Sequence, residues 1–383
     1  MKRLQPCDLV LGFVPLADCA SLAVAKEKGL FAAEGLNVAL SREPSWANIR
    51  DKVQLGLLDG AHMLGPMALA SSLGAGGERV PVIAPLALNL NGSAVTVSVA
   101  LAAEMRALDP ASMAVRPRTA APLRAVVERR RQDGQPPLVF AVVFPFSMHA
   151  YELRYWLADS GVDPDLDIRL VVAPPPRMAS QLRAGQIDGF CVGAPWNTVS
   201  EAEGTGEIVI RATEIWPNGP DKVLGLALDW AERRPDIVQA LLRSLIRAAA
   251  WADAPENRPE LAAILARADY VGAPRDLLEH SLQDVVFHRD FAGFPWTSHA
   301  AWFVSQMVRW GQVAPGPGLA SVAAGVYRPD LFRAAAADVG AATPSAQAKL
   351  VDPFLDGRSF DPADLEAYVA GFGIRRAPLA VAG

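Results

Sequence analysis

Short apolar runs alternate with segments of helical periodicity over the first part of the chain. Apolar runs that stop at glycine, proline or polar residues predict buried strands at residues 8–14, 36–40, 60–64 and 80–89. Apolar residues at helical spacing predict helices at residues 20–31, 46–58 and 67–73. Strands that alternate with helices through short connections favour a parallel sheet covered on both faces. This part of the chain is therefore predicted to form an α/β lobe.

A second set of alternating elements follows a crossing strand at residues 95–98 and a long charged helical segment, residues 101–131. It comprises predicted strands at 138–144, 168–172, 189–192 and 208–210, and predicted helices at 149–160, 176–184 and 196–203. Asp59-Gly60 and Asp188-Gly189 stand at equivalent places, each between a helix end and a strand start. The two sets thus share a construction.

A predicted strand at residues 223–228 leads back to the first lobe, and the chain from residue 231 onward is mainly helical. We therefore expect a two-lobed α/β clam-shell with two hinge crossings, near residues 95 and 223. Lobe I would comprise residues 1–94 and 223–383, and lobe II residues 95–222. The Pro-, Ala- and Gly-rich end of the chain is expected to be loosely ordered.

Composition narrows the class of protein. The 383 residues are 51% hydrophobic and 20% charged, which is typical of a compact globular chain long enough for two lobes. A formal net charge of −5 argues against a surface that coats nucleic acid. The three cysteines, Cys7, Cys19 and Cys191, are widely spaced and form no metal or redox motif.

The N-terminus leads us to expect a cytoplasmic protein. Met1-Lys2-Arg3 is followed almost at once by Pro6, Cys7 and Asp8, with no apolar stretch of the length that a secretory signal requires. No later run is long and apolar enough to suggest insertion into a membrane.

The sequence contains no catalytic motif in the right context, so we expect a binding protein and not an enzyme. The five histidines lack metal-ligand spacing, and no nucleophile-elbow, P-loop or dinucleotide fingerprint stands in the right context. Polar groups gather instead where predicted strands end, which is where open α/β sheets bind ligands. These groups are Ser45-Trp46, His62, the segment from Asn89 to Ser93, His149 and Asp221-Lys222. A lysine, a helix N-terminus and an imidazole together suit a small anion.

Six segments carry a specific resemblance. They are FVPLADCA (13–20), SREPSWANIRDK (41–52), AHMLGPM (61–67), LNLNG (88–92), HAYELRYWLA (149–158) and GFCVGAPWN (189–197). In this order they resemble the nitrate- and bicarbonate-binding proteins of ABC transporters, the NrtA/CmpA family. The resemblance covers roughly residues 8–310 and implies a type II periplasmic-binding-protein fold that holds an oxyanion between its lobes.

Carried over by position, the family's pocket falls on a small set of residues. It implies ligand contacts from Trp46, Ala47, Asn91, Gly92, Ser93, His149 and Lys222. Family members often carry an amide side chain where Ser93 stands, and Ala194 replaces a glutamate of the usual pattern, so these two positions depart from the family. No cofactor and no metal are implied beyond the anion.

Lys222 favours nitrate or nitrite as the ligand. Bicarbonate-binding members carry an acidic residue near this place, which can accept the proton of bicarbonate, whereas a permanent anion requires a fixed cation. With the expected cytoplasmic location, the chain resembles the family's NasS-type nitrate sensors. That resemblance implies a partner, a NasT-like RNA-binding antiterminator that is released when the anion binds.

Two alternatives stay open. One is the solute-binding component of a nitrate ABC transporter. The other, from a different class, is an enzyme similar to the thiamine-pyrimidine synthase, which shares this fold. That enzyme would need a cysteine-rich iron motif that three scattered cysteines do not supply.

Overall fold

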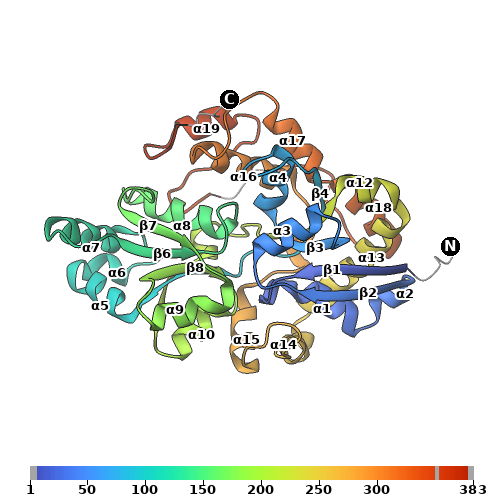
Figure 1. The fold of residues 1–383 in the computed structure, drawn as a ribbon, viewed down its shortest axis with the longest axis horizontal. Coiled ribbons are helices and arrows are strands. Elements are labelled where there is room, and N and C mark those ends of the chain that lie inside the picture. Colours follow the sequence, from blue (N-terminus) through green and yellow to red (C-terminus); the bar gives the residue numbers. More distant parts are fainter. Residues whose placement is uncertain (1–6, 350–352, 378–383) are drawn as a thin grey trace.

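Two five-stranded sheets lie side by side in the computed structural model, which describes residues 7–349 and 353–377 (Figure 1). The first sheet has the order β2-β1-β3-β10-β4 and consists of β1 (Cys7–Phe13), β2 (Leu36–Arg42), β3 (Gly60–Leu64), β4 (Val82–Ala87) and β10 (Lys222–Ala227). The second has the order β7-β6-β8-β5-β9 and consists of β5 (Ser93–Ser98), β6 (Leu138–Val142), β7 (Ile168–Val172), β8 (Gly189–Gly193) and β9 (Gly206–Arg211). Helices cover both sheets, so the predicted two-lobed α/β fold is confirmed.

The fourth strand of each sheet order comes from a segment that has just crossed from the other lobe. β5 runs antiparallel to both β8 and β9, and β10 runs antiparallel to both β3 and β4. The expectation of wholly parallel sheets is therefore wrong for these two strands. Each crossing segment reaches its new sheet at the edge where the neighbouring strands β3 and β8 end, so it has to run back along them. The division at residues 94/95 and 222/223 stays a prediction, and the sheets change over at neighbouring positions, Ser93 and Lys222.

The shared construction of the two lobes extends to a pair of aspartates. Val10 N–H donates to Asp59 Oδ2 at 2.8 Å, and Val139 N–H donates to Asp188 Oδ2 at 2.7 Å. Each aspartate in turn donates its own N–H to the carbonyl of the same valine, at 2.9 Å and 2.7 Å. Each aspartate directly precedes its strand, so these bonds set the register of β3 beside β1 and of β8 beside β6.

Two predicted helices are broken into shorter ones. The segment at 20–31 forms α1 (Ala20–Glu27) and α2 (Leu30–Ala33), because Gly29 takes φ of 66° between them. The segment at 101–131 forms α5 (Val99–Leu108), α6 (Pro110–Ala114) and α7 (Ala121–Gln132). Proline at 110 cannot continue the preceding helix because it lacks an N–H and clashes with the preceding turn.

The remaining helices fill the space around the sheets. Before β10 these are α3 (Trp46–Gln54), α4 (Gly65–Leu73), α8 (Met148–Asp159), α9 (Met178–Arg183), α10 (Trp196–Ala202) and α11 (Ala212–Ile215). After β10 the chain adds α12 (Leu228–Arg233), α13 (Pro235–Asp253), α14 (Arg258–Leu265), α15 (Arg275–Ser281), α16 (Thr297–Arg309), α17 (Leu319–Val326), α18 (Pro329–Val339) and α19 (Leu365–Ala370). Single 3₁₀ turns lie at Ala17–Cys19, Pro175–Arg177, Pro255–Asn257, Leu282–Asp284 and Arg289–Phe291.

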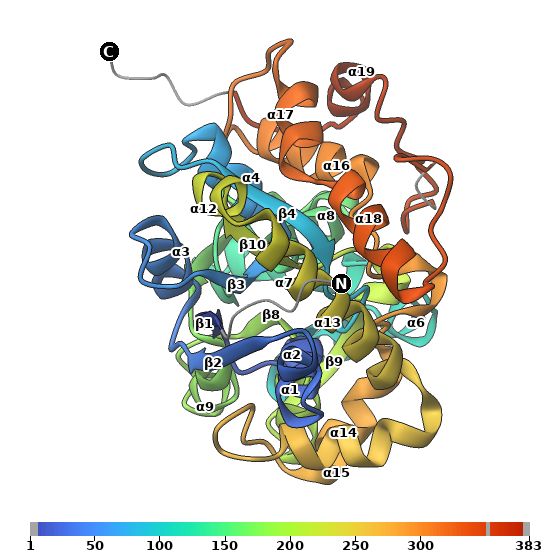
Figure 2. The same ribbon diagram turned by 90° about the vertical axis from the view of Figure 1, so that its right-hand side faces the viewer.

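The C-terminal part of the chain lies over the junction of the two lobes, where α16, α17 and α19 form one group (Figures 1 and 2). Phe354 stacks on Tyr155 of α8 with ring centroids 5.1 Å apart, and the Tyr155 hydroxyl donates to Asp356 Oδ2 at 2.9 Å. Leu355 N–H donates to the carbonyl of Ile215 at 2.9 Å. The expectation of a loosely ordered end is therefore wrong for residues 353–377, because aromatic burial fixes them. Residues 378–383 lie outside the described part.

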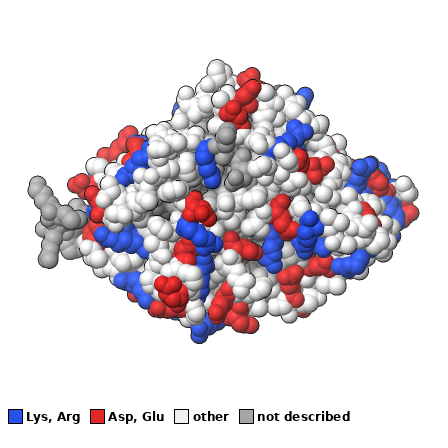
Figure 3. Space-filling model, turned by 180° about the vertical axis from the view of Figure 1, so that it is seen from behind, with Lys and Arg blue, Asp and Glu red and all other residues white. Residues whose placement is uncertain are grey.

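Charge is mixed over the surface. On the face shown in Figure 3, acidic and basic side chains lie interspersed and neither sign forms a continuous field. Within residues 7–349 and 353–377, no helix combines the length and the apolar character needed to cross a membrane.

Candidate anion-binding site

Lys222 lies at the start of β10, where the chain enters the first sheet. Its backbone pairs with Leu64 at the end of β3, and its N–H donates to Asn89 Oδ1 at 3.2 Å. The side chain is 0% exposed. Its ammonium lies 2.8 Å from Asp18 Oδ2 and also forms an ion pair with Asp221. The predicted cation is thus present in the site, but two carboxylates share it.

Asp18 links Lys222 to His62. Asp18 follows β1 in a short 3₁₀ turn, and its Oδ1 lies 2.7 Å from His62 Nε2. His62 Nδ1 accepts the N–H of Val14 at 3.4 Å, so the ring proton belongs on Nε2, towards the carboxylate. Burial alone would raise the pKa of Asp18, but the charge of Lys222 and the adjacent imidazole of His62 outweigh it and hold that pKa below its usual value.

The pKa of Lys222 is shifted in the direction that keeps it charged. Burial works to lower this pKa, and the two adjacent carboxylates, Asp18 and Asp221, raise it by more. Lys222 is therefore a permanent cation in the site at neutral pH.

Trp46 forms an aromatic wall beside Lys222. It is the first residue of α3, where the predicted helix at 46–58 also begins, and the N-cap Ser45 accepts the N–H of Asn48 at 3.3 Å. The ammonium of Lys222 lies 5.5 Å from the centroid of the Trp46 ring, and the imidazole of His62 lies 5.2 Å from it. Trp46 Nε1 is buried without a hydrogen-bond partner. Ala47 follows in the first helical turn, where backbone N–H groups have no partner within the helix.

His149 reaches the same place from lobe II. Ser147 caps α8 by accepting the N–H of Ala150 at 3.0 Å, which sets His149 in the first turn. The ring is 0% exposed, and Nδ1 and Nε2 both lack a hydrogen-bond partner. Nε2 lies 3.5 Å from Asp221 Oδ2. Burial lowers the pKa of His149 to about 4, against the opposing effect of Asp221, so the ring is neutral at pH 7.

Gly193, the last residue of β8, allows groups of the two lobes to meet. A Cβ atom placed there would lie 3.3 Å from Asp18 Oδ2 and 3.4 Å from His149 Nε2. Just beyond it, Ala17 N–H donates to the carbonyl of Ala194 at 2.8 Å, from lobe I to lobe II. A Cβ atom here would press on Asp18 Oδ2, so glycine leaves more room for these polar groups to converge.

The 91–93 segment supports the site from the first crossing. Asn91 has φ of 59° and Gly92 has φ of 91°, so the chain turns sharply before β5. The Gly92 carbonyl accepts the N–H of Ala194 at 2.8 Å, next to Gly193. Asn91 Oδ1 is buried without a partner, whereas the hydroxyl of Ser93 donates to Glu152 Oε2. The hydrogen bond of Ser93 is thus directed into lobe II.

The structure adds four groups to the predicted set: Asp18, His62, Asp221 and Glu152. The sequence analysis noted His62 and Asp221 only as polar groups at strand ends. Glu152 lies one helical turn after His149 on α8 and is 2% exposed. Burial raises its pKa to about 8 although the Ser93 hydroxyl opposes that shift. A Glu three residues after a candidate ligand was a visible signal, because residues at that spacing share a helix face.

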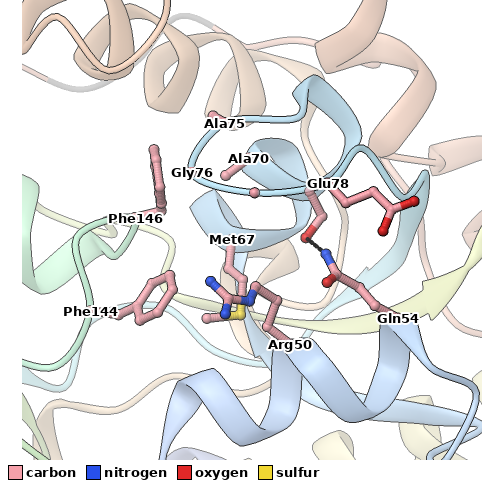
Figure 4. A pocket seen from close by; sticks show the side chains of 11 residues that line it. Arg50, Gln54, Met67, Ala70, Ala75, Gly76, Glu78, Phe144 and Phe146 are labelled. Carbon is pink, nitrogen blue, oxygen red and sulfur yellow. Dashed lines mark hydrogen bonds between the residues drawn. The ribbon is translucent and has the colours of Figure 1, made fainter.

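A cavity of about 110 Å³ lies between the lobes (Figure 4). Arg50 and Gln54 of α3 face Phe144 and Phe146 of lobe II across it, and Met67 of α4 also lines it. None of the seven predicted ligand residues lines it. Among the described residues, no group of three or more His, Cys, Asp or Glu is arranged to hold a metal ion.

Two α/β lobes joined by crossing strands, with buried polar groups that converge between them, define the class of periplasmic binding proteins. Among solved structures, the periplasmic nitrate-binding protein NrtA of Synechocystis PCC 6803 superposes with a TM-score of 0.86 and 28% identity, over 96% of this chain and 98% of that one. The chain is similar in architecture over nearly its whole length.

Sequence comparison places the chain in a family. Residues 3–266 match the NMT1-like family. The nitrate/nitrite binding protein NrtA of Nostoc is 31% identical over 98% of this chain and 87% of its own length. The nitrate import ATP-binding protein NrtC of Synechocystis is 35% identical over 97% of this chain, which spans only 56% of that protein. The chain belongs to the NMT1-like family and, within it, to the NrtA/CmpA group of solute-binding proteins.

Proposed function

We propose that this chain binds nitrate and nitrite between its lobes as the solute-binding component of an ABC transporter. The observation that carries the proposal is the meeting of Lys222, Trp46 and His149 at one buried place between the lobes. Lys222 supplies the positive charge, the Trp46 ring supplies a flat apolar wall, and His149 supplies two ring nitrogens that have no other partner. A small planar anion suits this combination.

Ala47, Asn91, Gly92 and Ser93 complete the proposed site. The first turn of α3 offers free N–H groups at Ala47, which favour an anion at a helix N-terminus. Asn91 and Gly92 shape the turn that precedes β5, and Ser93 positions Glu152 behind His149.

The relatives support the transporter role first, because NrtA is named for binding nitrate and nitrite and NrtC for nitrate import. Control of a NasT-like antiterminator in the cytoplasm stays a prediction of the sequence analysis. Size-exclusion chromatography of the two proteins with and without nitrate tests it: a complex that nitrate dissociates supports the sensor role, and separate elution in both conditions contradicts it.

Calorimetric titration with nitrate, nitrite, bicarbonate and sulfate tests the proposed ligand. We expect saturable binding of nitrate and nitrite and much weaker binding of the other two. Bicarbonate belongs in the comparison because it carries a proton that a carboxylate can accept in a hydrogen bond. The carboxylates of Asp18 and Asp221 both lie against Lys222. Binding of bicarbonate as tight as that of nitrate would contradict the selectivity that we assign to Lys222.

A further inference from the structure

The charged groups of the site do not balance. Lys222 is in contact with two carboxylates, Asp18 and Asp221, and the three side chains are 0%, 4% and 3% exposed. His62 lies against Asp18 and accepts the N–H of Val14 at Nδ1, so it is not a permanent cation like Lys222. One cation against two anions leaves this cluster with an excess of one negative charge.

Entry of a further anion would increase that excess in a place that water screens poorly. Like charges repel strongly when buried, and burial also removes the solvation of each charge. The structure offers no second buried lysine or arginine in contact with Asp18 or Asp221 among the described residues. A compensating positive charge therefore has to arise within the site when the anion binds.

His149 is the group in the position to acquire this positive charge. Both ring nitrogens are buried and unpartnered, and Nε2 faces Asp221 Oδ2 at 3.5 Å. From lobe I, Asp18 also approaches the ring, since Asp18 and His149 flank Gly193.

The other ionisable groups near His149 are less suited to take up a proton. Lys222, from β10, is already protonated. Glu152, on the same helix, already holds a proton at pH 6, because burial raises its pKa to about 8. A protonated His149 would gain two N–H donors, one for Asp221 and one for the bound anion.

We propose that each nitrate or nitrite that binds here brings one proton from solvent, which is held on the imidazole of His149. This inference rests on the proposed function and concerns the same site. The proton and the anion enter together and leave together, so the net charge of the buried cluster does not change.

This coupling predicts how affinity depends on pH. In the free protein the pKa of His149 is about 4, so above about pH 5 the ring is neutral before the anion arrives. Linkage then requires that the dissociation constant rise with pH, by up to about tenfold per unit, until the pKa of the liganded site is reached.

Calorimetry of nitrate binding to the intact chain at pH 6, in two buffers with different heats of ionisation, measures the number of protons taken up. We expect about one proton per anion. The variant His149→Gln keeps a hydrogen-bonding side chain that does not titrate, and it should bind more weakly with no proton uptake. His280→Gln, at an exposed position, is the matched control and should behave like the unmodified chain.

The outcomes separate this inference from the proposed function. Binding without proton uptake in the unmodified chain overturns the inference and leaves the proposed function intact. Undiminished uptake in His149→Gln overturns the assignment to His149. Absence of any nitrate or nitrite binding overturns both. If His149→Gln does not fold, the proton count of the unmodified chain and the slope of affinity against pH still decide the matter.

Discussion

The ammonium of Lys222 lies 2.8 Å from the carboxylate of Asp18, although 204 positions separate the two residues in the sequence. Both side chains are buried at the face that lobe I presents to lobe II. The contact joins the start of β10 to the turn that follows β1. It makes the charge of Lys222 available to a ligand only in competition with protein carboxylates.

Removal of the lysine should therefore affect both stability and binding. Lys222→Met leaves Asp18 and Asp221 buried without a counter-ion, and loss of one partner of a buried ion pair costs about 3–5 kcal/mol. Urea unfolding should show this loss at pH 7, and calorimetry should show that nitrate binding is abolished. Lys28→Met is the control, because its ion pair with the exposed Glu260 should contribute at most about 1 kcal/mol. A variant Lys222→Met with unchanged nitrate affinity would exclude Lys222 from the site.

Neutralising one competing carboxylate should have the opposite effect on binding. Asp18→Asn keeps the size of the side chain but removes its charge, which leaves Lys222 freer to attract an anion. We expect nitrate affinity to rise by about tenfold. This corresponds to about 1.4 kcal/mol of binding free energy, which is within the range of interaction energies between nearby charges. Calorimetry measures the change, with Asp51→Asn as the control for an exposed carboxylate paired with Arg50. Weaker binding in Asp18→Asn would show that this carboxylate holds the site together instead of competing with the ligand.

A single methyl group at Gly193 should obstruct the place where the lobes meet. Gly193→Ala would put a Cβ atom 3.3 Å from Asp18 Oδ2 and 3.4 Å from His149 Nε2. Alanine is compatible with a strand, so we expect the variant to fold and to bind nitrate at least about tenfold more weakly, because a filled site excludes the ligand. Gly77→Ala is the matched control, since nothing lies within 4 Å of the atom it would add. Equal nitrate affinity in the two variants would place the ligand elsewhere.

Glu152 should make the stability of the ligand-free protein depend on pH. Its pKa is raised by burial from 4.5 to about 8, so above pH 4.5 the folded state holds a proton that the unfolded chain has released. The stabilisation is complete below about pH 4.5 and is lost as the pH rises to about 8. The free energy of unfolding should thus fall from pH 7 to pH 8. His149 does not cause this fall, because its pKa is 6.5 in an unfolded chain and about 4 in the folded one.

Glu152→Gln should flatten this profile, because glutamine retains a hydrogen-bond partner for Ser93 but does not titrate. Urea unfolding at several pH values provides the measurement. Glu260→Gln, at an exposed position, is the control and should leave the profile unchanged. A profile equally steep in Glu152→Gln would show that another group causes the dependence.

The sequence by itself determined the elements and the class of fold. Alternation of apolar runs and helical periodicity located most strands and helices within a few residues, including the starts of α3 and α8, which Ser45 and Ser147 cap in the structure. These features are local, because they depend on residues close together in the chain. Trp46 and His149 were predicted as ligand residues because they stand near the ends of predicted strands and match the family's pocket by position.

Only the tertiary structure decided how the site is charged and which strands reverse. β5 and β10 run antiparallel because each enters its sheet from the other lobe, and nothing in their own residues encodes that direction. Asp18, His62 and Lys222 meet from three separate elements, so no spacing along the chain could reveal their pairing. The order of the C-terminal segment also depends on a distant partner. Its composition suggested a loosely ordered end, but Phe354 packs on Tyr155 in the structure. Local patterns determine where an element begins, whereas the electrostatics of a buried site depend on partners that the fold brings together.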